Sequence, residues 1–134
     1  MTSEVGEDLV AAAFEGWAKG DGDFFSILAD DVSWTITGSS PVAGTYTSRR
    51  DFIERAIQPI GARLSQPIRP TVVRIITEGN TVVVLWDGHT VAKDGLAYDN
   101  RYCWIMRMEH GKVKEAVAFF DSATLTDLLE RVSP

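Results

Sequence analysis

Asp87 and His89 are the residues of this sequence best suited to acid–base chemistry. They lie two positions apart in an apolar run typical of a strand, so their side chains share one strand face, about 7 Å apart at the backbone. A nearby carboxylate orients an imidazole and favours its protonated form, whereas burial favours the neutral forms of both groups. The pair is therefore a candidate general acid and base near neutral pH.

A structural interpretation of the same pair is also open. A satisfied polar pair at a pocket mouth or at a contact between subunits would show the same spacing, because perturbed pairs also arise for structural reasons. Alanine substitution of each residue separates the two interpretations. Turnover of an identified substrate that survived both changes would exclude the catalytic one.

Other residues could form the wall of a ligand pocket. Asn100 and Tyr102 share one face of another predicted strand and could hydrogen-bond an oxygen of a bound molecule, although such groups also serve neighbouring protein atoms. Trp34 and Trp104 offer flat apolar surfaces that suit either rings of a ligand or the filling of a core. Together with Asp87 and His89, these residues predict a largely apolar pocket with a few polar groups.

Helical patterns dominate the first half of the chain, and turn residues separate them. Ser48 is a good N-cap, and Pro59 and Gly61 disrupt the helical pattern that follows it. The elements expected here are a helix over 3–19, a short helix from Phe24 that ends at Asp30, a strand over 32–37, a loop over 38–44 and a helix after Ser48.

The second half changes to long β-rich runs joined by short turns, which predicts antiparallel hairpins. The runs cover 68–77, 81–92, 96–108 and 113–120, and a helix over 122–131 follows them. Asp121 precedes that helix and either caps it or lies at the cavity entrance. Helices followed by a long antiparallel sheet predict an α+β fold, in which a curved sheet and the helices on its concave side leave a hollow.

Composition limits the classes of function. The 134 residues fit one domain over 1–134, and the net charge of -6 disfavours nucleic acid and anionic membranes as partners. No apolar stretch approaches the length of a membrane span, and the acidic N-terminus is unlike a secretory signal. The one cysteine, Cys103, cannot form an intramolecular disulfide, which favours the cytoplasm. With two histidines beside it, we expect no metal site and no cofactor.

Three stretches, taken in order, resemble the nuclear transport factor two-like superfamily, in particular its SnoaL-like and ketosteroid isomerase-like branch. They are Gly20-Asp21 before 28–31, Tyr98 to Trp104, and 111–113 running to 119–121. The resemblance covers about residues 5 to 130. It implies a cone-shaped curved antiparallel sheet wrapped around N-terminal helices, with an internal pocket. Members of such a fold have many functions, so function must come from the site.

The pocket orientation of the ketosteroid isomerase branch implies which residues face inward. They are Trp34, Ile36, Leu85, Asp87, His89, Val91, Asn100, Tyr102, Trp104, Ala116, Ala118 and Phe120. From these we expect Asp87 and His89 to be catalytic. We expect substrate contacts from Trp34, Ile36, Asn100, Tyr102, Trp104, Ala118 and Phe120.

The resemblance also excludes two known catalytic sets. Ala13, Ile36 and Trp104 occupy the positions of the three catalytic groups of the ketosteroid isomerase branch. In the limonene-epoxide-hydrolase branch, an arginine lies between two carboxylates. Leu85 and Ala118 stand where that arginine and the second acid are expected, so Asp87 is the one match.

The function predicted from these residues is binding of a hydrophobic cyclic small molecule. Turnover by a cofactor-independent isomerase, cyclase or hydrolase using general acid–base chemistry is one form of it, and whether the protein is an enzyme stays open. The alternative is a non-catalytic ligand-binding or dimerisation domain of the same fold. We expect a homodimer formed through the outer sheet face, to which we assign Trp86, Cys103 and Ile105.

Overall fold

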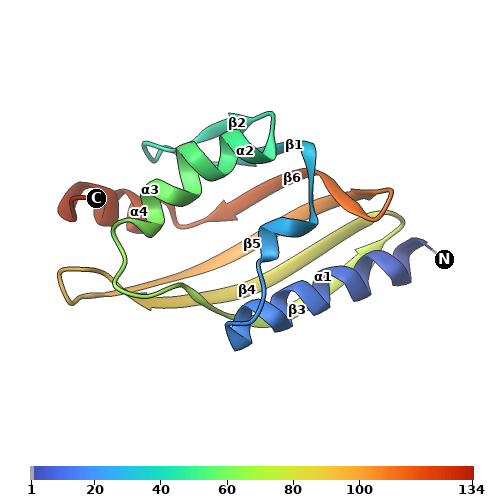
Figure 1. Ribbon diagram of the computed structural model, residues 1–134, viewed down its shortest axis with the longest axis horizontal. Coiled ribbons are helices and arrows are strands. Elements are labelled where there is room, and N and C mark those ends of the chain that lie inside the picture. The colour runs from blue at the N-terminus through green and yellow to red at the C-terminus, as the bar shows by residue number, and fades with distance from the viewer. Residues whose placement is uncertain (1) are drawn as a thin grey trace.

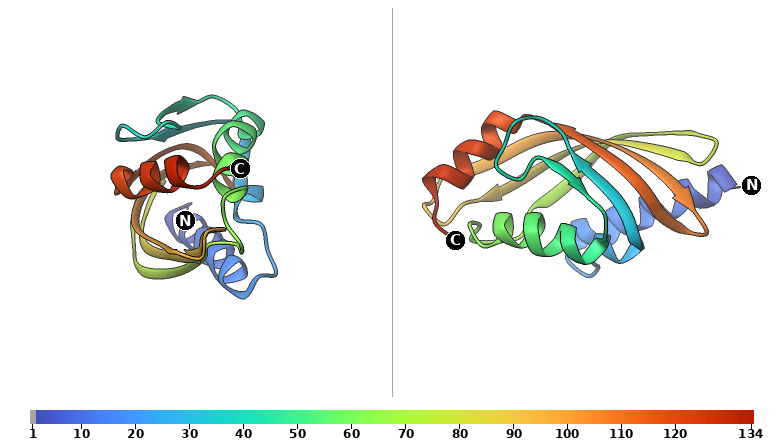
Figure 2. Two further views of the ribbon diagram at one scale, coloured as in Figure 1. Left: turned by 90° about the vertical axis from the view of Figure 1, so that its left-hand side faces the viewer. Right: turned by 90° about the horizontal axis from the view of Figure 1, so that it is seen from above.

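A long curved sheet with helices on its concave side forms the framework of the protein (Figures 1 and 2). The computed structural model describes residues 2–134. The elements are α1 (Thr2–Lys19), a 3-10 turn (Phe24–Ile27), β1 (Leu28–Ile36), β2 (Gly44–Tyr46), α2 (Arg49–Phe52), a π-helical turn (Ile53–Ile57), α3 (Gln58–Gly61), β3 (Arg69–Glu78), β4 (Thr81–Val91), β5 (Ala97–Glu109), β6 (Lys112–Phe120) and α4 (Ser122–Arg131). Among the described helices, none combines the length and apolar character needed to cross a membrane.

The six strands follow the order β2-β1-β6-β5-β4-β3, and the sheet does not close. Within the described chain, β1 and β6 pair in parallel and the other neighbouring strands pair antiparallel. The predicted α+β fold with a curved sheet around helices is confirmed. The strands of the long hairpins match the predicted runs closely. Each of the turns at 79–80, 93–96 and 110–111 contains a glycine, the residue that favours a tight chain reversal.

The helix after Ser48 continues further than its sequence predicts. Ser48 caps it as expected, with its Oγ accepting a hydrogen bond from Asp51 N at 3.0 Å. The predicted disruption is wrong at Pro59, through which the helix continues, but the helix does end at Gly61. The π-helical turn at Ile53–Ile57 widens the helix just before Pro59. A wider turn relieves the clash between a proline ring and the carbonyl four residues earlier.

The region around β1 differs from the prediction in two ways. The second helix is only the 3-10 turn Phe24–Ile27, started by Asp23, and Leu28 already belongs to the strand. The predicted loop over 38–44 ends in the short strand β2, which pairs with the end of β1. A hydrogen bond between the hydroxyls of Thr35 and Thr45, 2.9 Å apart, joins the two strands.

Large apolar side chains fill the space between the sheet and α1. On β4 the buried residues are Val82, Val84 and Trp86, and on β5 they include Trp104 and Met106. Phe14 of α1 contacts Trp86 and Trp104 from the helix side, with ring centroids 5.5 and 5.7 Å away. The core therefore extends along the concave face and ends at the cavity described next.

Candidate functional site

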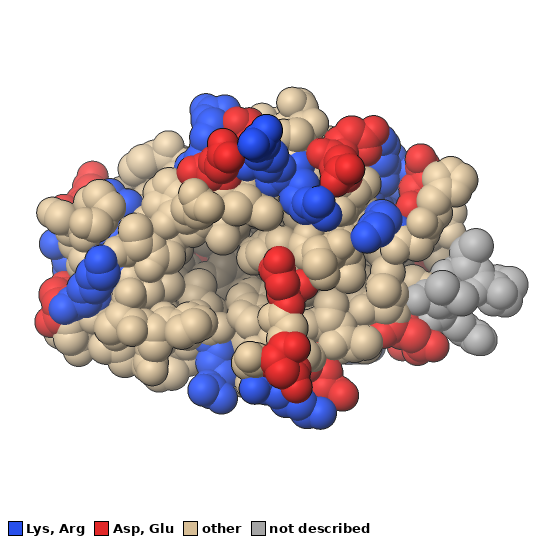
Figure 3. Space-filling view, in the orientation of Figure 1, with Lys and Arg blue, Asp and Glu red and all other residues tan. Residues whose placement is uncertain are grey.

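A cavity of about 240 Å³ lies between the concave face of the sheet and the helix formed by α2 and α3. A hollow bordered mainly by uncharged side chains opens on the face seen in Figure 3. All four tryptophans of the chain, Trp17, Trp34, Trp86 and Trp104, line the cavity. No Asp, Glu, Lys, Arg or His occurs among the lining residues in the part of the chain that the structure describes. Apolar burial and aromatic contact are thus what this cavity offers a ligand.

Six of the seven expected contact residues line the cavity. They are Trp34, Ile36, Tyr102, Trp104, Ala118 and Phe120. They come from β1, β5 and β6, and the inner faces of these strands are those that the resemblance implied. Ala116 is buried on the same face of β6. The seventh residue, Asn100, is buried on the inner face of β5 but is outside the lining.

The side-chain amide of Asn100 is held by the backbone of Asp121. Asn100 Nδ2 donates to Asp121 O at 3.0 Å, and Asp121 N donates to Asn100 Oδ1 at 3.1 Å. An N–H must donate and a carbonyl must accept, so these two bonds fix which side of the amide is nitrogen. Nδ2 also donates to the hydroxyl of Tyr98 at 3.2 Å. Asn100 therefore orients Tyr98 and the start of α4 and does not contact the cavity.

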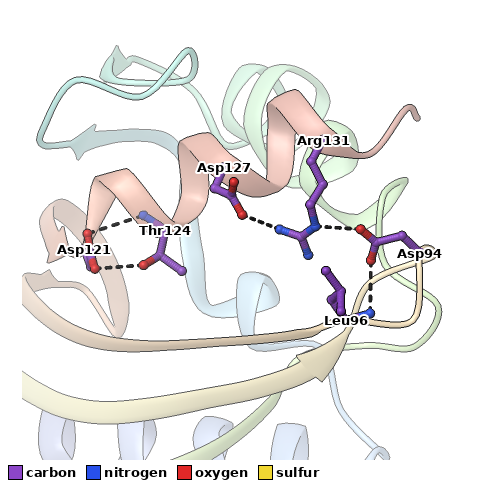
Figure 4. Close-up of polar contacts among 6 residues, drawn as sticks. All are labelled: Asp94, Leu96, Asp121, Thr124, Asp127 and Arg131. Carbon is purple, nitrogen blue, oxygen red and sulfur yellow. Dashed lines mark hydrogen bonds and ion pairs between the residues drawn. The ribbon is translucent and has the colours of Figure 1, made fainter.

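Asp121 is the N-cap of α4 (Figure 4). Its Oδ1 accepts hydrogen bonds from Ala123 N at 3.0 Å and Thr124 N at 3.4 Å, and its Oδ2 accepts one from the Thr124 hydroxyl at 2.8 Å. These bonds hold the pKa of the carboxyl below its usual value. The capping interpretation is confirmed. At the other end of α4, Arg131 donates to Asp94 at 2.6 Å and joins the helix to the turn between β4 and β5.

Tyr98 and Tyr102 are the residues with hydroxyl groups among the described lining residues of the cavity. Both side chains line it, and their hydroxyl oxygens lie 3.1 Å apart. Burial raises the pKa of both phenols above the ordinary value of 10.0, and that of Tyr102 well above it. Both groups are therefore protonated at neutral pH and can donate hydrogen bonds.

We expect these raised pKa values to make the protein less stable above pH 10. The unfolded chain releases its tyrosine protons near pH 10, whereas folded Tyr102 retains its proton to a higher pH. The stabilisation is complete below pH 10 and is lost as the pH rises toward the folded pKa. Urea unfolding between pH 8 and 11 should show this loss, and Tyr102→Phe should reduce it. Equal losses in the variant and the wild type would contradict the assignment.

Asp87 and His89 lie on the outer face of the sheet, so their predicted place on the pocket wall is wrong. Asp87 accepts two hydrogen bonds from Arg101, at 2.6 and 2.9 Å, and His89 Nδ1 contacts Asp99. Arg101 holds the pKa of the Asp87 carboxyl below its usual value. These are cross-strand pairs on β4 and β5, and neither Asp87 nor His89 lines the cavity.

The rest of β4 is turned in the same way. Leu85 and Val91 lie with Asp87 on the outer face, while Trp86 and Thr90 are buried inside. The assignment of Trp86 to the outer face is therefore also wrong. Gly88 fits this register, because a Cβ there would lie 3.0 Å from side-chain atoms of Trp86 and Tyr102. The close packing around the stacked rings explains glycine at this position.

The sequence profile of the SnoaL-like domain matches residues 10–116. The chain belongs to the SnoaL-like family. This confirms the resemblance inferred from the order of the three sequence stretches. No curated protein sequence is significantly similar to this SnoaL-like protein.

Solved structures share the fold of this SnoaL-like protein. A nuclear transport factor two-like protein from Burkholderia pseudomallei K96243 is 22% identical, with a TM-score of 0.78 over 93% of this chain and 97% of its own. Bal32a, from a soil-derived mobile gene cassette, is 15% identical, with a TM-score of 0.80 over 96% and 99% of the two chains. TerC, co-crystallised with polyporic acid, is 20% identical, with a TM-score of 0.73 over 94% and 98%.

Several cavity residues of this SnoaL-like protein were missed in the sequence. Trp86 and Tyr98 come from the hairpin of β4 and β5, and Phe52 comes from the helix that starts at Ser48. Tyr98 has the same parity along β5 as Asn100 and Tyr102, so strand alternation could have identified it. Trp17 and Leu125 are on the apolar sides of predicted helices, but their approach to the cavity depends on how those helices pack.

Proposed function

We propose that this protein binds a small, flat, largely apolar ring compound in the cavity between the sheet and the α2–α3 helix. The observation that carries the proposal is an aromatic-walled cavity of about 240 Å³ without a charged lining residue among those described. A cavity of ~150 Å³ lined by apolar side chains takes up benzene. The cavity of this protein has about one and a half times that volume, which suits roughly two fused six-membered rings.

The walls favour a flat ligand. Trp34 stacks on Phe52 with centroids 4.6 Å apart, and Trp86 stacks on Tyr102 with centroids 4.1 Å apart. Trp104 is nearly perpendicular to Trp34, at 89°, so the cavity offers both faces and edges of aromatic rings. Offset stacking and edge-to-face contacts stabilise aromatic partners beyond simple burial. The co-crystallisation of the structural neighbour TerC with polyporic acid supports a small-molecule role for the same fold.

Ligand binding is better supported than general acid–base catalysis. The titratable side chains described in the lining are those of Tyr98 and Tyr102. Because burial raises the pKa of both, neither accepts a proton readily near neutral pH. A cofactor-independent isomerase, cyclase or hydrolase acting in this cavity would thus have to use a phenol as an acid or hydrogen-bond donor. The cytoplasm stays the expected location.

The binding proposal is tested with tetralin, a two-ring hydrocarbon. We expect saturable binding, with shifts of the tryptophan indole N–H resonances, because all four tryptophans line the cavity. Ala118→Phe adds a ring to the inner face of β6 and should weaken binding by about tenfold or more, since the added ring takes up a large part of the cavity.

Val117→Phe is the matched control, because Val117 is the next residue on β6 and lies opposite Ile105 on the outer face. It should leave tetralin affinity unchanged. Asp87→Asn and His89→Gln should do the same. Tetralin that failed to bind the folded wild-type protein, or that bound Ala118→Phe as tightly, would refute the proposal.

A homodimer through the outer sheet face is a second proposal. An apolar band crosses the sheet there, where Ile105 pairs with Val117 on the neighbouring strand and Cys103 with Phe119. Ile105 and Phe119 are 38% and 46% exposed. The ion pairs Asp87–Arg101 and Arg107–Glu115 lie on the same face. Each ion pair has one positive and one negative charge, so two copies of this face would not repel each other through an excess of one charge. Contiguous exposed apolar surface of this kind marks protein contacts.

Sedimentation equilibrium at micromolar concentration tests the homodimer. We expect the wild type to sediment as a dimer and Phe119→Glu as a monomer, because the new carboxylate would be buried without a partner. Leu96→Glu is the control, since Leu96 is 57% exposed at the edge of the turn between β4 and β5 and lies outside the band. A monomeric wild type would refute the proposal.

A further inference from the structure

The two phenols of the cavity have more hydrogens than their mutual contact uses. Tyr98 and Tyr102 each have one hydroxyl hydrogen, and a single hydrogen bond joins their oxygens. One hydrogen lies in that bond. The other has no acceptor among the described residues, whichever tyrosine holds it.

Asn100, the third residue of this hydrogen-bonded group, cannot accept the remaining hydrogen. Its amide presents Nδ2 to Tyr98, because its Oδ1 accepts from Asp121 N and its Nδ2 also donates to Asp121 O. Tyr98 therefore receives a hydrogen bond from Asn100. An oxygen that accepts a hydrogen bond becomes a better donor, so the network strengthens the remaining O–H group.

We propose that the Tyr98–Tyr102 pair, oriented by Asn100, donates its uncommitted phenolic hydrogen to a carbonyl or similar neutral oxygen of the ring compound bound in the cavity. This inference rests on the proposed function and names the ligand class: a flat bicyclic ring system with one hydrogen-bond acceptor. Both tyrosines line the cavity, so the cavity is the side on which an acceptor can arrive. Among the described lining residues there is no carboxylate that could accept this hydrogen in place of the ligand.

The geometry also explains why an oxygen is selected over a bare hydrocarbon. A carbonyl loses its hydrogen bonds to water when it enters an apolar cavity, and this cost is recovered only if the protein supplies a donor. The phenol pair supplies that donor beside Trp86, which stacks on Tyr102 at 4.1 Å. A ring system lying along this stack could place its oxygen at the hydroxyl pair.

The test compares 1-tetralone with tetralin, which share the two-ring skeleton and differ by one carbonyl oxygen. The double variant Tyr98→Phe/Tyr102→Phe should lose about five- to tenfold in 1-tetralone affinity and retain its tetralin affinity. Each single variant keeps one free phenolic hydrogen and should be nearer to the wild type. Tyr46→Phe is the control, because Tyr46 is the third tyrosine and its hydroxyl donates to Val42 O at 2.7 Å, outside the cavity lining.

The outcomes separate the two proposals. Wild-type affinity of the double variant for both ligands would overturn the phenol donor and leave the proposed function standing. A single variant that lost the whole effect would overturn the sharing of one donor by the pair. If neither 1-tetralone nor tetralin bound to the wild type, both the proposed function and this inference would be overturned. Retained tetralin binding shows that the double variant is folded.

Discussion

Trp104→Ala is expected to lower the free energy of unfolding by about 3–5 kcal/mol, the range for removing a large aromatic side chain from a core. Trp104 is 6% exposed, and its ring centroid lies within 6.3 Å of six other aromatic rings in the described structure. These rings come from α1, the 3-10 turn and three strands, so no single movement fills the space left behind. Urea unfolding followed by circular dichroism measures the loss.

Ile105→Ala is the matched control for Trp104→Ala. Ile105 is the next residue on β5 and is 38% exposed on the outer face. Both truncations are compared in the Phe119→Glu background, where the proposed dimer contact is absent. There, truncation of Ile105 should cost less than about 1 kcal/mol, because surface substitutions away from special features have small effects. Similar losses in the two variants would contradict the placement of Trp104 in the core and of Ile105 on the surface.

Asn100→Leu is expected to cost about 2–3 kcal/mol of unfolding free energy, through unpaired polar groups and not through lost volume. The substitution removes both bonds to the Asp121 backbone and the bond to Tyr98. The N–H of Asp121 then has no partner in the partly buried junction between β6 and α4, and its C=O keeps only the long bond from Leu125 N at 3.4 Å. Urea unfolding measures the loss, and amide hydrogen exchange in α4 should locate it.

Asp99→Ala is the control for Asn100→Leu, because Asp99 is the adjacent residue and its side chain is 63% exposed on the outer face. It should change stability by less than about 0.5 kcal/mol, as exposed ion pairs contribute little. Unchanged stability of Asn100→Leu would show that water replaces the amide and that Asn100 does not orient Tyr98.

Local signals predicted most of the elements. The turns with glycine defined the hairpins, and the ends of β3 to β6 differ from the prediction by at most one residue. Ser48 marked a helix start correctly. The π-helical turn and the strand β2 were not predicted, because one depends on how a helix accommodates Pro59 and the other is three residues long and held by its neighbour.

The face of β4 shows where sequence reasoning failed. Residues 82–86 are apolar at both odd and even positions, so alternation alone does not reveal the inner face. The orientation was therefore taken from a resemblance, and it was wrong for this strand alone among the four that line the pocket. The reversal placed Asp87 and His89 outside and Trp86 inside.

The sequence did contain a correcting signal. In a hairpin that turns at 93–95, Asp87 lies opposite Arg101 and His89 opposite Asp99, and directly opposed residues share a face. Opposite charges at both positions agree with this register. Cys103 was assigned to the outer face, and Asp99 and Arg101 have the same parity along β5, so Asp87 and His89 had to lie there too. The cavity volume and the contact between Tyr98 and Tyr102 depend on sheet curvature and helix packing.

Because all four tryptophans line one cavity, the intrinsic tryptophan fluorescence of the protein should report on what the cavity contains. Trp104 lies 4.9 Å from both Trp34 and Trp86, and Trp17 lies 5.1 Å from Trp86, measured between ring centroids. At these separations excited-state energy passes between the indoles before emission. Energy transfer of this kind lowers the fluorescence anisotropy. A ligand that quenches one indole therefore also lowers the fluorescence intensity of the other three.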